Sequence, residues 1–136
     1  MKTFLVWLVT SAALFGGVAG GYHVYLQSHP REVLVVVDSS FPMAGGWGSV
    51  AAILDRLDDS RYSRYTLWTE KADVHGPRPA LALARTVAFA PRDFARLFER
   101  LNKDEVGAST RRVLVTNAPE SELSRFSDWE VIRVGA

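Results

Sequence analysis

The sequence contains no cysteine. This absence excludes disulfide bonds, zinc sites built on thiolates, and thiol nucleophiles. The three histidines, His23, His29 and His75, are not spaced as metal ligands. The formal net charge is only +1, so charge alone does not indicate a nucleic-acid partner. No motif places a nucleophile beside a catalytic base. We therefore expect no enzyme activity, no small-molecule substrate and no cofactor.

Charged residues are also missing from the stretch Phe4–Leu26. A helix of about 23 residues is long enough to span the ~30 Å hydrocarbon core of a bilayer. Aromatic residues lie near both ends of the run, as in an interfacial belt. We therefore expect a single-pass membrane protein, with an anchor over residues 1–27, a short linker over 28–31 and a folded domain over 32–136.

A cleaved signal peptide is the alternative interpretation of the same stretch. Lys2 forms a short basic region, and Val18-Ala19-Gly20 is an acceptable cleavage site. The apolar run continues past that site, which favours an uncleaved anchor. Positive charge at the amino terminus, with Arg31 balanced by Glu32 on the other flank, predicts an extracytoplasmic, periplasmic domain.

Small residues in the apolar run suggest contact with another helix. They form two small-xxx-small pairs, a spacing that lets helices approach closely in lipid. The positions are Gly16, Gly17, Gly20 and Gly21. The predicted partners are therefore the lipid bilayer and a membrane protein complex.

The remaining chain has the pattern of an α/β domain. Val33–Val37 is an unbroken apolar run typical of a strand buried on both faces. The predicted fold is a small, mostly parallel, Rossmann-like sheet with helices on both faces. We expect strands at 33–37, 62–69, 113–115 and 129–134, and helices at 47–59, 91–101 and 120–125. Residues 70–79 and 102–110 are predicted as loops, and 81–90 as an edge strand or a partly helical segment.

The stretch Val35-Val36-Val37-Asp38-Ser39-Ser40-Phe41-Pro42-Met43 resembles the start of a von Willebrand factor A-type domain. In that family the first strand ends in Asp-x-Ser-x-Ser, whose side chains help to hold a divalent cation. The resemblance implies a shortened domain and makes Asp38, Ser40 and Asn117 candidate ligands for magnesium or calcium. The motif is degenerate, because Pro42 replaces the second serine and Asn117 the family's aspartate. Asp38 and Ser40 alone are a poor set of ligands for a hard cation.

Apolar side chains also follow the first strand, in the loop that contains Phe41, Met43 and Trp47. These residues either enter the core or form a partner-binding surface, since exposed aromatics and methionine favour interfaces. A basic stripe over Arg92, Arg96, Arg100 and Lys103 is either a solvated face or a contact for anionic headgroups or an acidic partner.

Together these features favour a membrane-anchored accessory subunit that docks on a membrane complex through its helix and its small domain. The alternative is a metal-dependent adhesion or assembly factor with a working cation site at Asp38 and Ser40.

Overall fold

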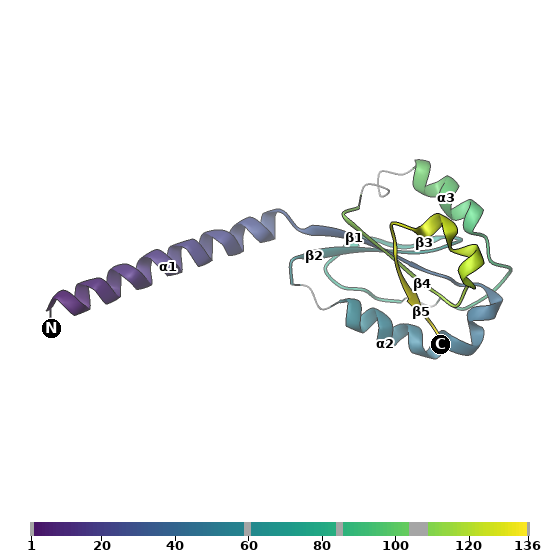
Figure 1. Cartoon of the computed structure of the whole chain (residues 1–136), viewed down its shortest axis with the longest axis horizontal. Coiled ribbons are helices and arrows are strands. Elements are labelled where there is room, and N and C mark those ends of the chain that lie inside the picture. The colour runs from purple at the N-terminus through teal and green to yellow at the C-terminus, as the bar shows by residue number, and fades with distance from the viewer. Residues whose placement is uncertain (1, 59–60, 84–85, 104–108, 136) are drawn as a thin grey trace. The chain divides into compact units, whose positions relative to one another are not determined.

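The computed structural model describes residues 2–58, 61–83, 86–103 and 109–135. The chain forms two compact units, the first ending at Pro30 and the second beginning at Arg31. The first unit is one helix, α1 (Lys2–Ser28), with no buried residue (Figure 1). Helix α1 is long and apolar enough to cross a membrane, although a signal sequence or the core helix of a soluble protein passes the same test of length and composition.

A five-stranded sheet forms the centre of the second unit, in the order β3-β2-β1-β4-β5 (Figure 1). The central strand β1 (Arg31–Val37) pairs in parallel with β2 (Ser63–Thr69) and with β4 (Arg111–Thr116). Strand β5 (Glu130–Arg133) is parallel to β4, and β3 (Asp73–Arg78) is antiparallel to β2. The predicted α/β class with a mostly parallel sheet is confirmed.

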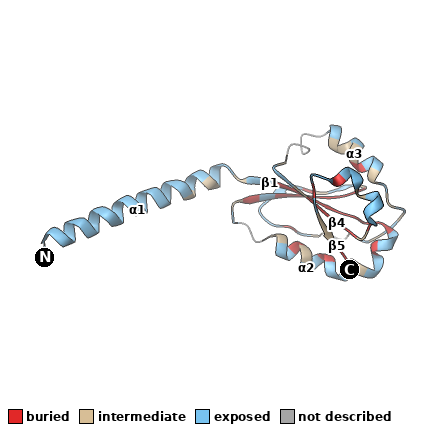
Figure 2. Ribbon diagram, viewed as in Figure 1, coloured by how far each residue is buried: buried red, intermediate tan, exposed pale blue. Residues whose placement is uncertain are grey.

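The sheet has a separate hydrophobic core on each face, because successive side chains of a strand point to opposite sides. Helix α2 (Trp47–Leu57) covers one face and buries Val50 and Leu54 against it. Helix α3 (Phe94–Lys103) packs on the other face through Leu97. Figure 2 shows the buried residues concentrated along the strands between these helices. The prediction that helices cover both faces is therefore confirmed.

The predicted loop over residues 70–79 is wrong, because β3 occupies most of it. Gly76 and Pro77 suggested a break in the chain, but both residues are tolerated in a strand at the edge of a sheet. The pairing of β3 with β2 contains register shifts, which absorb their irregular geometry. Residues 81–90 were predicted as an edge strand or a partly helical segment, but 81–83 and 86–90 form neither a strand nor a helix, and residues 84–85 lie outside the described part.

The start of one helix also differs from the sequence-based prediction. Pro91 was expected in the first turn of a helix, but α3 begins at Phe94. Asp93 Oδ1 accepts a hydrogen bond from Arg96 N at 2.9 Å, as an N-terminal capping carboxylate does. The basic stripe is thereby divided: Arg92 precedes the helix, and Arg100 stacks over the ring of Trp68.

The segment after β1 is more regular than the loop that was predicted there. It forms the 3-10 helix η1 (Phe41–Gly46), which leads directly into α2. The helix predicted over 120–125 is instead two short 3-10 helices, η3 (Glu120–Glu122) and η4 (Ser124–Phe126). The predicted end of α2 at position 59 and most of the predicted loop at 102–110 lie outside the described residues.

Gly46 is required where η1 approaches the end of the sheet. A Cβ atom at this position would lie 2.4 Å from Cγ1 of Val134, whose branched side chain cannot easily move away. We expect Gly46→Ala to lower the free energy of unfolding by about 1–3 kcal/mol, as overpacking substitutions do. Chemical denaturation of the variant in detergent would measure this change.

Gly45→Ala is the matched control, because a Cβ atom at Gly45 meets nothing within 4 Å. Its free energy of unfolding should stay within about 0.5 kcal/mol of the parent value. Equal losses in the two variants would show that the contact with Val134 does not account for the effect.

Candidate functional site

Asp38 lies at the carboxyl edge of the sheet, the edge at which β1, β2 and β4 end. Its side chain is fully buried. Oδ1 accepts a hydrogen bond from Ser40 N at 3.0 Å, and Oδ2 accepts one from Thr116 Oγ1 at 2.5 Å. Both oxygens of the carboxylate are therefore held by the protein itself.

A guanidinium supplies the positive charge beside this buried carboxylate. Arg92 Nε donates to Asp38 Oδ2 at 2.7 Å, and the Arg92 side chain is only 12% exposed. Arg92 also donates to Asn117 Oδ1 at 2.6 Å and to Glu122 Oε2 at 3.0 Å. Burial lowers the pKa of Arg92, but the hydrogen bond and charge of Asp38, and then those of Glu122, raise it above its ordinary value.

These bonds join chain segments at the topological switch point of the sheet. The strand order places β1 between β2 and β4, so the loops after β1 and β4 diverge there. Open α/β sheets bind their ligands in the crevice between such loops. Here Asn117 Nδ2 donates across it to the Pro42 carbonyl at 2.6 Å, and Arg92 joins Asp38 to Asn117. The crevice is therefore bridged from within.

A second buried carboxylate holds the same loop from the other side. Glu70 follows β2 and is fully buried. Its Oε2 accepts hydrogen bonds from Ser39 N at 2.6 Å and from Ser39 Oγ at 3.1 Å, while Oε1 forms an ion pair with Lys71. Charged hydrogen bonds of this kind are the stronger ones in proteins, so the start of the loop after β1 is rigidly held.

Three observations bear on the divalent cation that the sequence resemblance implies. Ser40 Oγ is buried and has no hydrogen-bond partner among the residues that the structure describes, which leaves one oxygen available to a ligand. Against this, Asp38 already carries a guanidinium at 2.7 Å, which would repel a second cation. In the described part of the chain, no three acidic, histidine or cysteine residues are grouped as metal ligands. The donor set does not fit magnesium or calcium, which need several free oxygens.

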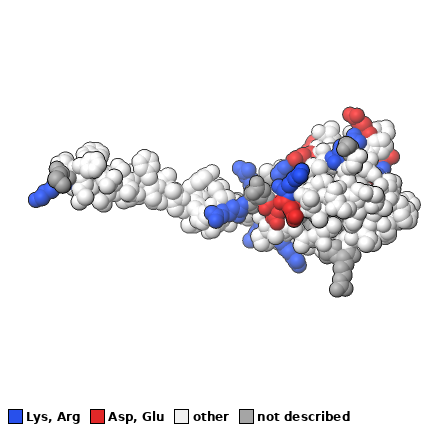
Figure 3. Space-filling model, turned by 90° about the horizontal axis from the view of Figure 1, so that it is seen from below, with Lys and Arg blue, Asp and Glu red and all other residues white. Residues whose placement is uncertain are grey.

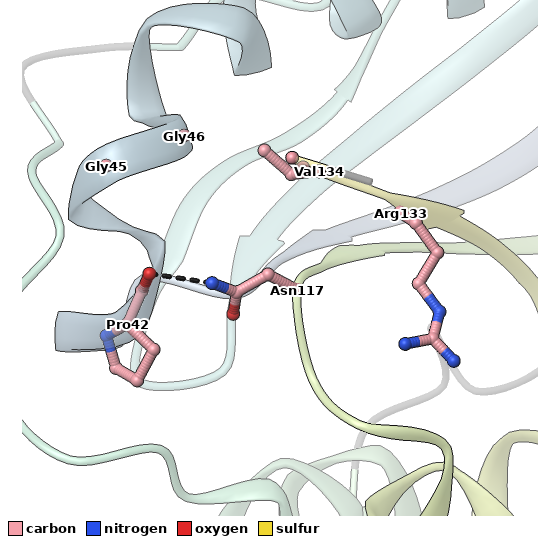
Figure 4. A pocket seen from close by; sticks show the side chains of 7 residues that line it. Pro42, Gly45, Gly46, Asn117, Arg133 and Val134 are labelled. Atoms are coloured by element: carbon pink, nitrogen blue, oxygen red, sulfur yellow. Dashed lines mark hydrogen bonds between the residues drawn. The ribbon is translucent and has the colours of Figure 1, made fainter.

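A cavity of about 550 Å³ lies beside this bridged crevice (Figure 4). Its polar side chains are Asn117 and Arg133, which donate to the carbonyls of Pro42 and Ala118 respectively. Figure 4 shows Asn117 reaching across to Pro42 below Gly45 and Gly46. The full lining is Pro42, Gly45, Gly46, Asn117, Arg133, Val134 and Gly135. Both polar side chains are thus engaged in hydrogen bonds to the backbone of the domain.

The predicted partner-binding residues of the loop after β1 fall into three environments. Phe41 is 62% exposed. Trp47 is half-buried against the core under α2. Met43 is fully buried in that core, which corrects its assignment to a partner-binding surface. Phe41 alone of the three is available to another protein over most of its side chain.

Residues 87–90, predicted as part of an edge strand or a partly helical segment, carry further exposed apolar groups and are hydrogen-bonded through their backbone to the start of the loop after β1. Phe41 N donates to Ala90 O at 3.0 Å, and Phe89 N donates to Ser39 O at 2.7 Å. Val87 is 62% exposed and Phe89 is 49% exposed. Ala90 has a φ of 63°, a left-handed conformation that is uncommon for a residue with a side chain. We call the two aromatic residues Phe41 and Phe89, together with the aliphatic Val87, the aromatic patch.

Positive charge borders this aromatic patch. The Lys71 ammonium lies 5.2 Å from the centroid of the Phe89 ring. A shallow cavity of about 540 Å³ is lined by Lys71, Phe89, Arg92 and Arg96, together with Ala72, Ala90, Pro91 and Asp93. The surface therefore combines exposed aromatic groups with basic side chains.

The glycines of α1 form the other predicted contact surface. A Cβ atom built at Gly16, Gly17, Gly20 or Gly21 would meet nothing within 4 Å. The space beside each of these four positions is therefore open.

The chain matches no protein-family model, no curated protein and no solved structure. Its function is therefore inferred from the geometry of its own residues.

Sequence reasoning singled out Asp38, Ser40 and Asn117, and the structure brings all three to one edge. The sequence analysis missed Arg92 as the partner of Asp38 and Asn117, because it assigned Arg92 to a basic stripe along a helix. The proline before it and the Asp93 cap after it were the available signal that Arg92 lies outside that helix. The sequence analysis also missed Glu70. The sequence carries no signal for this residue, because its partner Ser39 is 31 residues away.

Proposed function

We propose that this protein is a single-pass membrane-anchored accessory subunit. In this proposal α1 spans the bilayer and associates with a helix of a membrane complex, while the α/β domain binds a protein of that complex. The domain is a shortened von Willebrand factor A-like, Rossmann-like module on the extracytoplasmic side. The order of its elements, with Asp38-Ser39-Ser40 after β1 and a β2–β3 hairpin, supports this assignment.

One observation carries the non-catalytic part of the proposal. The crevice in which an α/β sheet would bind a ligand is bridged by Arg92, Asp38 and Asn117. Groups that could otherwise act on a substrate are engaged in holding loops together. This rigidity suits a docking surface, because a preorganised surface loses little conformational entropy when it binds.

The aromatic patch is the proposed docking surface of the domain. Monomeric proteins seldom leave several large apolar side chains exposed together, and such groups mark contact sites. Lys71 and Arg96 at its border favour a partner segment that carries acidic as well as apolar side chains. Partner recognition would then combine apolar burial with charge complementarity.

A metal-dependent adhesion or assembly factor is the second candidate. The unpartnered Ser40 Oγ favours it, because a cation bound beside Asp38 would satisfy that atom. It requires Arg92 to move away from Asp38, which makes it the weaker of the two.

Binding of the membrane complex should depend on both surfaces separately. We expect Phe41→Ala to weaken association at least tenfold, since an aromatic hot-spot residue contributes about 2 kcal/mol or more. Gly17→Leu should weaken it too, because a bulky side chain keeps a partner helix at a distance. The measurement is quantitative recovery of the same partner protein from mild detergent extracts, identified by mass spectrometry.

Asp55→Ala is the control, since Asp55 is an exposed residue of α2 that belongs to neither surface. Thermal unfolding should confirm that all three variants stay folded. Recovery at the parent level from Phe41→Ala, Gly17→Leu and their double variant would refute docking through these surfaces.

A further inference from the structure

Arginines gather at the amino edge of the sheet, opposite the candidate site. Parallel strands begin at a common edge, and the antiparallel β3 ends there. Arg31 pairs in register with Ser63, and Arg78 pairs with Tyr65 near the start of β2. The set comprises Arg31, Arg61, Arg64, Arg78, Arg111 and Arg112, which we call the arginine edge.

Among the described residues, only part of this charge is paired with a carboxylate. Arg111 and Arg112 form ion pairs with Glu130 and Asp128. The other four arginines are exposed and form no ion pair with any residue among 2–58, 61–83, 86–103 and 109–135. Figure 3 shows basic side chains gathered at the end of the domain where β1 begins, with acidic ones between them.

The chain itself keeps this edge near the membrane if α1 spans it, which rests on the proposed function. Only His29 and Pro30 separate the end of α1 at Ser28 from the start of β1 at Arg31. Three Cα–Cα steps reach at most about 11 Å. A linker this short lets Arg31 approach the lipid headgroups to within the Debye length of about 8 Å at physiological ionic strength, where exposed charges interact.

We propose that the arginine edge binds the headgroups of anionic phospholipids. Guanidinium groups form paired hydrogen bonds with phosphate, and several of them act together at a charged surface. The carboxyl edge lies at the opposite end of the same strands. Binding of the arginine edge to lipid therefore turns the aromatic patch away from the bilayer, towards a partner protein.

The test uses the full chain in nanodiscs of phosphatidylcholine, either alone or with about a third of the lipid replaced by the anionic phosphatidylglycerol. The chain has no cysteine, so Thr110→Cys labels the arginine edge alone with a fluorophore. Headgroup-attached nitroxide lipid quenches a label that lies at the surface. We expect quenching to rise at least twofold with the anionic lipid. It should fall back at about 0.5 M salt, because the Debye length then shrinks to about 4 Å.

Charge removal at the arginine edge should abolish this increase. Arg64→Gln/Arg78→Gln removes two of its exposed charges and leaves Arg31, next to the helix, unchanged. Arg96→Gln/Arg125→Gln removes two exposed charges elsewhere on the domain and should keep the increase. A label at Glu120→Cys, beyond the end of β4, should show weak quenching in both lipids.

Equal quenching of the Thr110→Cys label in both lipids would overturn the proposal, because the linker alone would then place the edge. Absence of quenching in any lipid would overturn it too. Loss of the charge-dependent increase in the Arg96→Gln/Arg125→Gln control would also contradict it. Failure of the full chain to enter nanodiscs would instead refute the membrane anchor, so the two proposals fail separately.

Discussion

Replacing Arg92 by methionine should lower the free energy of unfolding of the domain by about 3–5 kcal/mol. The substitution keeps much of the side-chain volume but removes the guanidinium that lies 2.7 Å from Asp38. Asp38 is fully buried, so its charge would be left with only Thr116 and the Ser40 amide as partners. Denaturant unfolding followed by tryptophan fluorescence would measure the loss.

A double-mutant cycle separates the ion pair from general packing. Adding Asp38→Asn to Arg92→Met should recover part of the stability, because the uncompensated charge is then gone. Arg96→Met, an exposed neighbour, should change stability by less than about 0.5 kcal/mol. A loss of stability in Arg92→Met no larger than that of Arg96→Met would show that Arg92 does not hold this edge together.

Chelation of metal from the parent protein tests the metal-dependent alternative. With Arg92 in place, EDTA and magnesium should leave the melting temperature of the parent unchanged, because the guanidinium already compensates Asp38. Since the pKa of Arg92 lies above its ordinary value, its charge persists throughout the usual pH range. A drop in melting temperature on chelation, reversed by magnesium, would favour the cation site instead.

Phe126→Ala should also destabilise the domain, by about 3–5 kcal/mol. The Phe126 ring is 2% exposed and lies at the centre of an aromatic cluster. Its centroid is 5.0 Å from that of Phe94, 4.8 Å from Phe98 and 5.3 Å from Trp129. Truncation leaves a cavity beneath α3 and loosens the segment that carries Arg92, whose guanidinium lies over Phe94.

Phe41→Ala is the matched control, since it deletes the same ring from an exposed position. It should change the free energy of unfolding by less than about 0.5 kcal/mol while weakening partner binding. Denaturant unfolding of the two variants compares them directly. Similar stability losses would mean that Phe41 supports the fold, and its place in the proposed docking surface would then be lost.

Local patterns in the sequence were sufficient for the architecture. The apolar run Val33–Val37 and the three- and four-residue spacing of Phe94, Leu97 and Phe98 depend only on neighbours in the chain. They correctly predicted a strand buried on both faces and a helix packed on one face of the sheet. The long uncharged stretch of α1 was visible in the same way.

Contacts between distant residues decided the site. Asp38 and Arg92 are 54 positions apart, and Ser39 and Glu70 are 31 apart, so no local pattern relates them. The strand β3 was missed because Gly76 and Pro77 have a low propensity for β-strands, which the pairing with β2 outweighs. The sequence was compatible with either an exposed or a buried Met43, and the packing of η1 against the sheet shows that it is buried.

The sequence by itself therefore determined the class of fold, the order of most elements and the edge at which Asp38 lies. These follow from hydrophobic periodicity, which is a property of the chain alone. Only the tertiary structure decided that a guanidinium compensates Asp38, and that the arginines of separate strands share one edge. Both depend on strand order and register, which bring together side chains that the sequence keeps far apart.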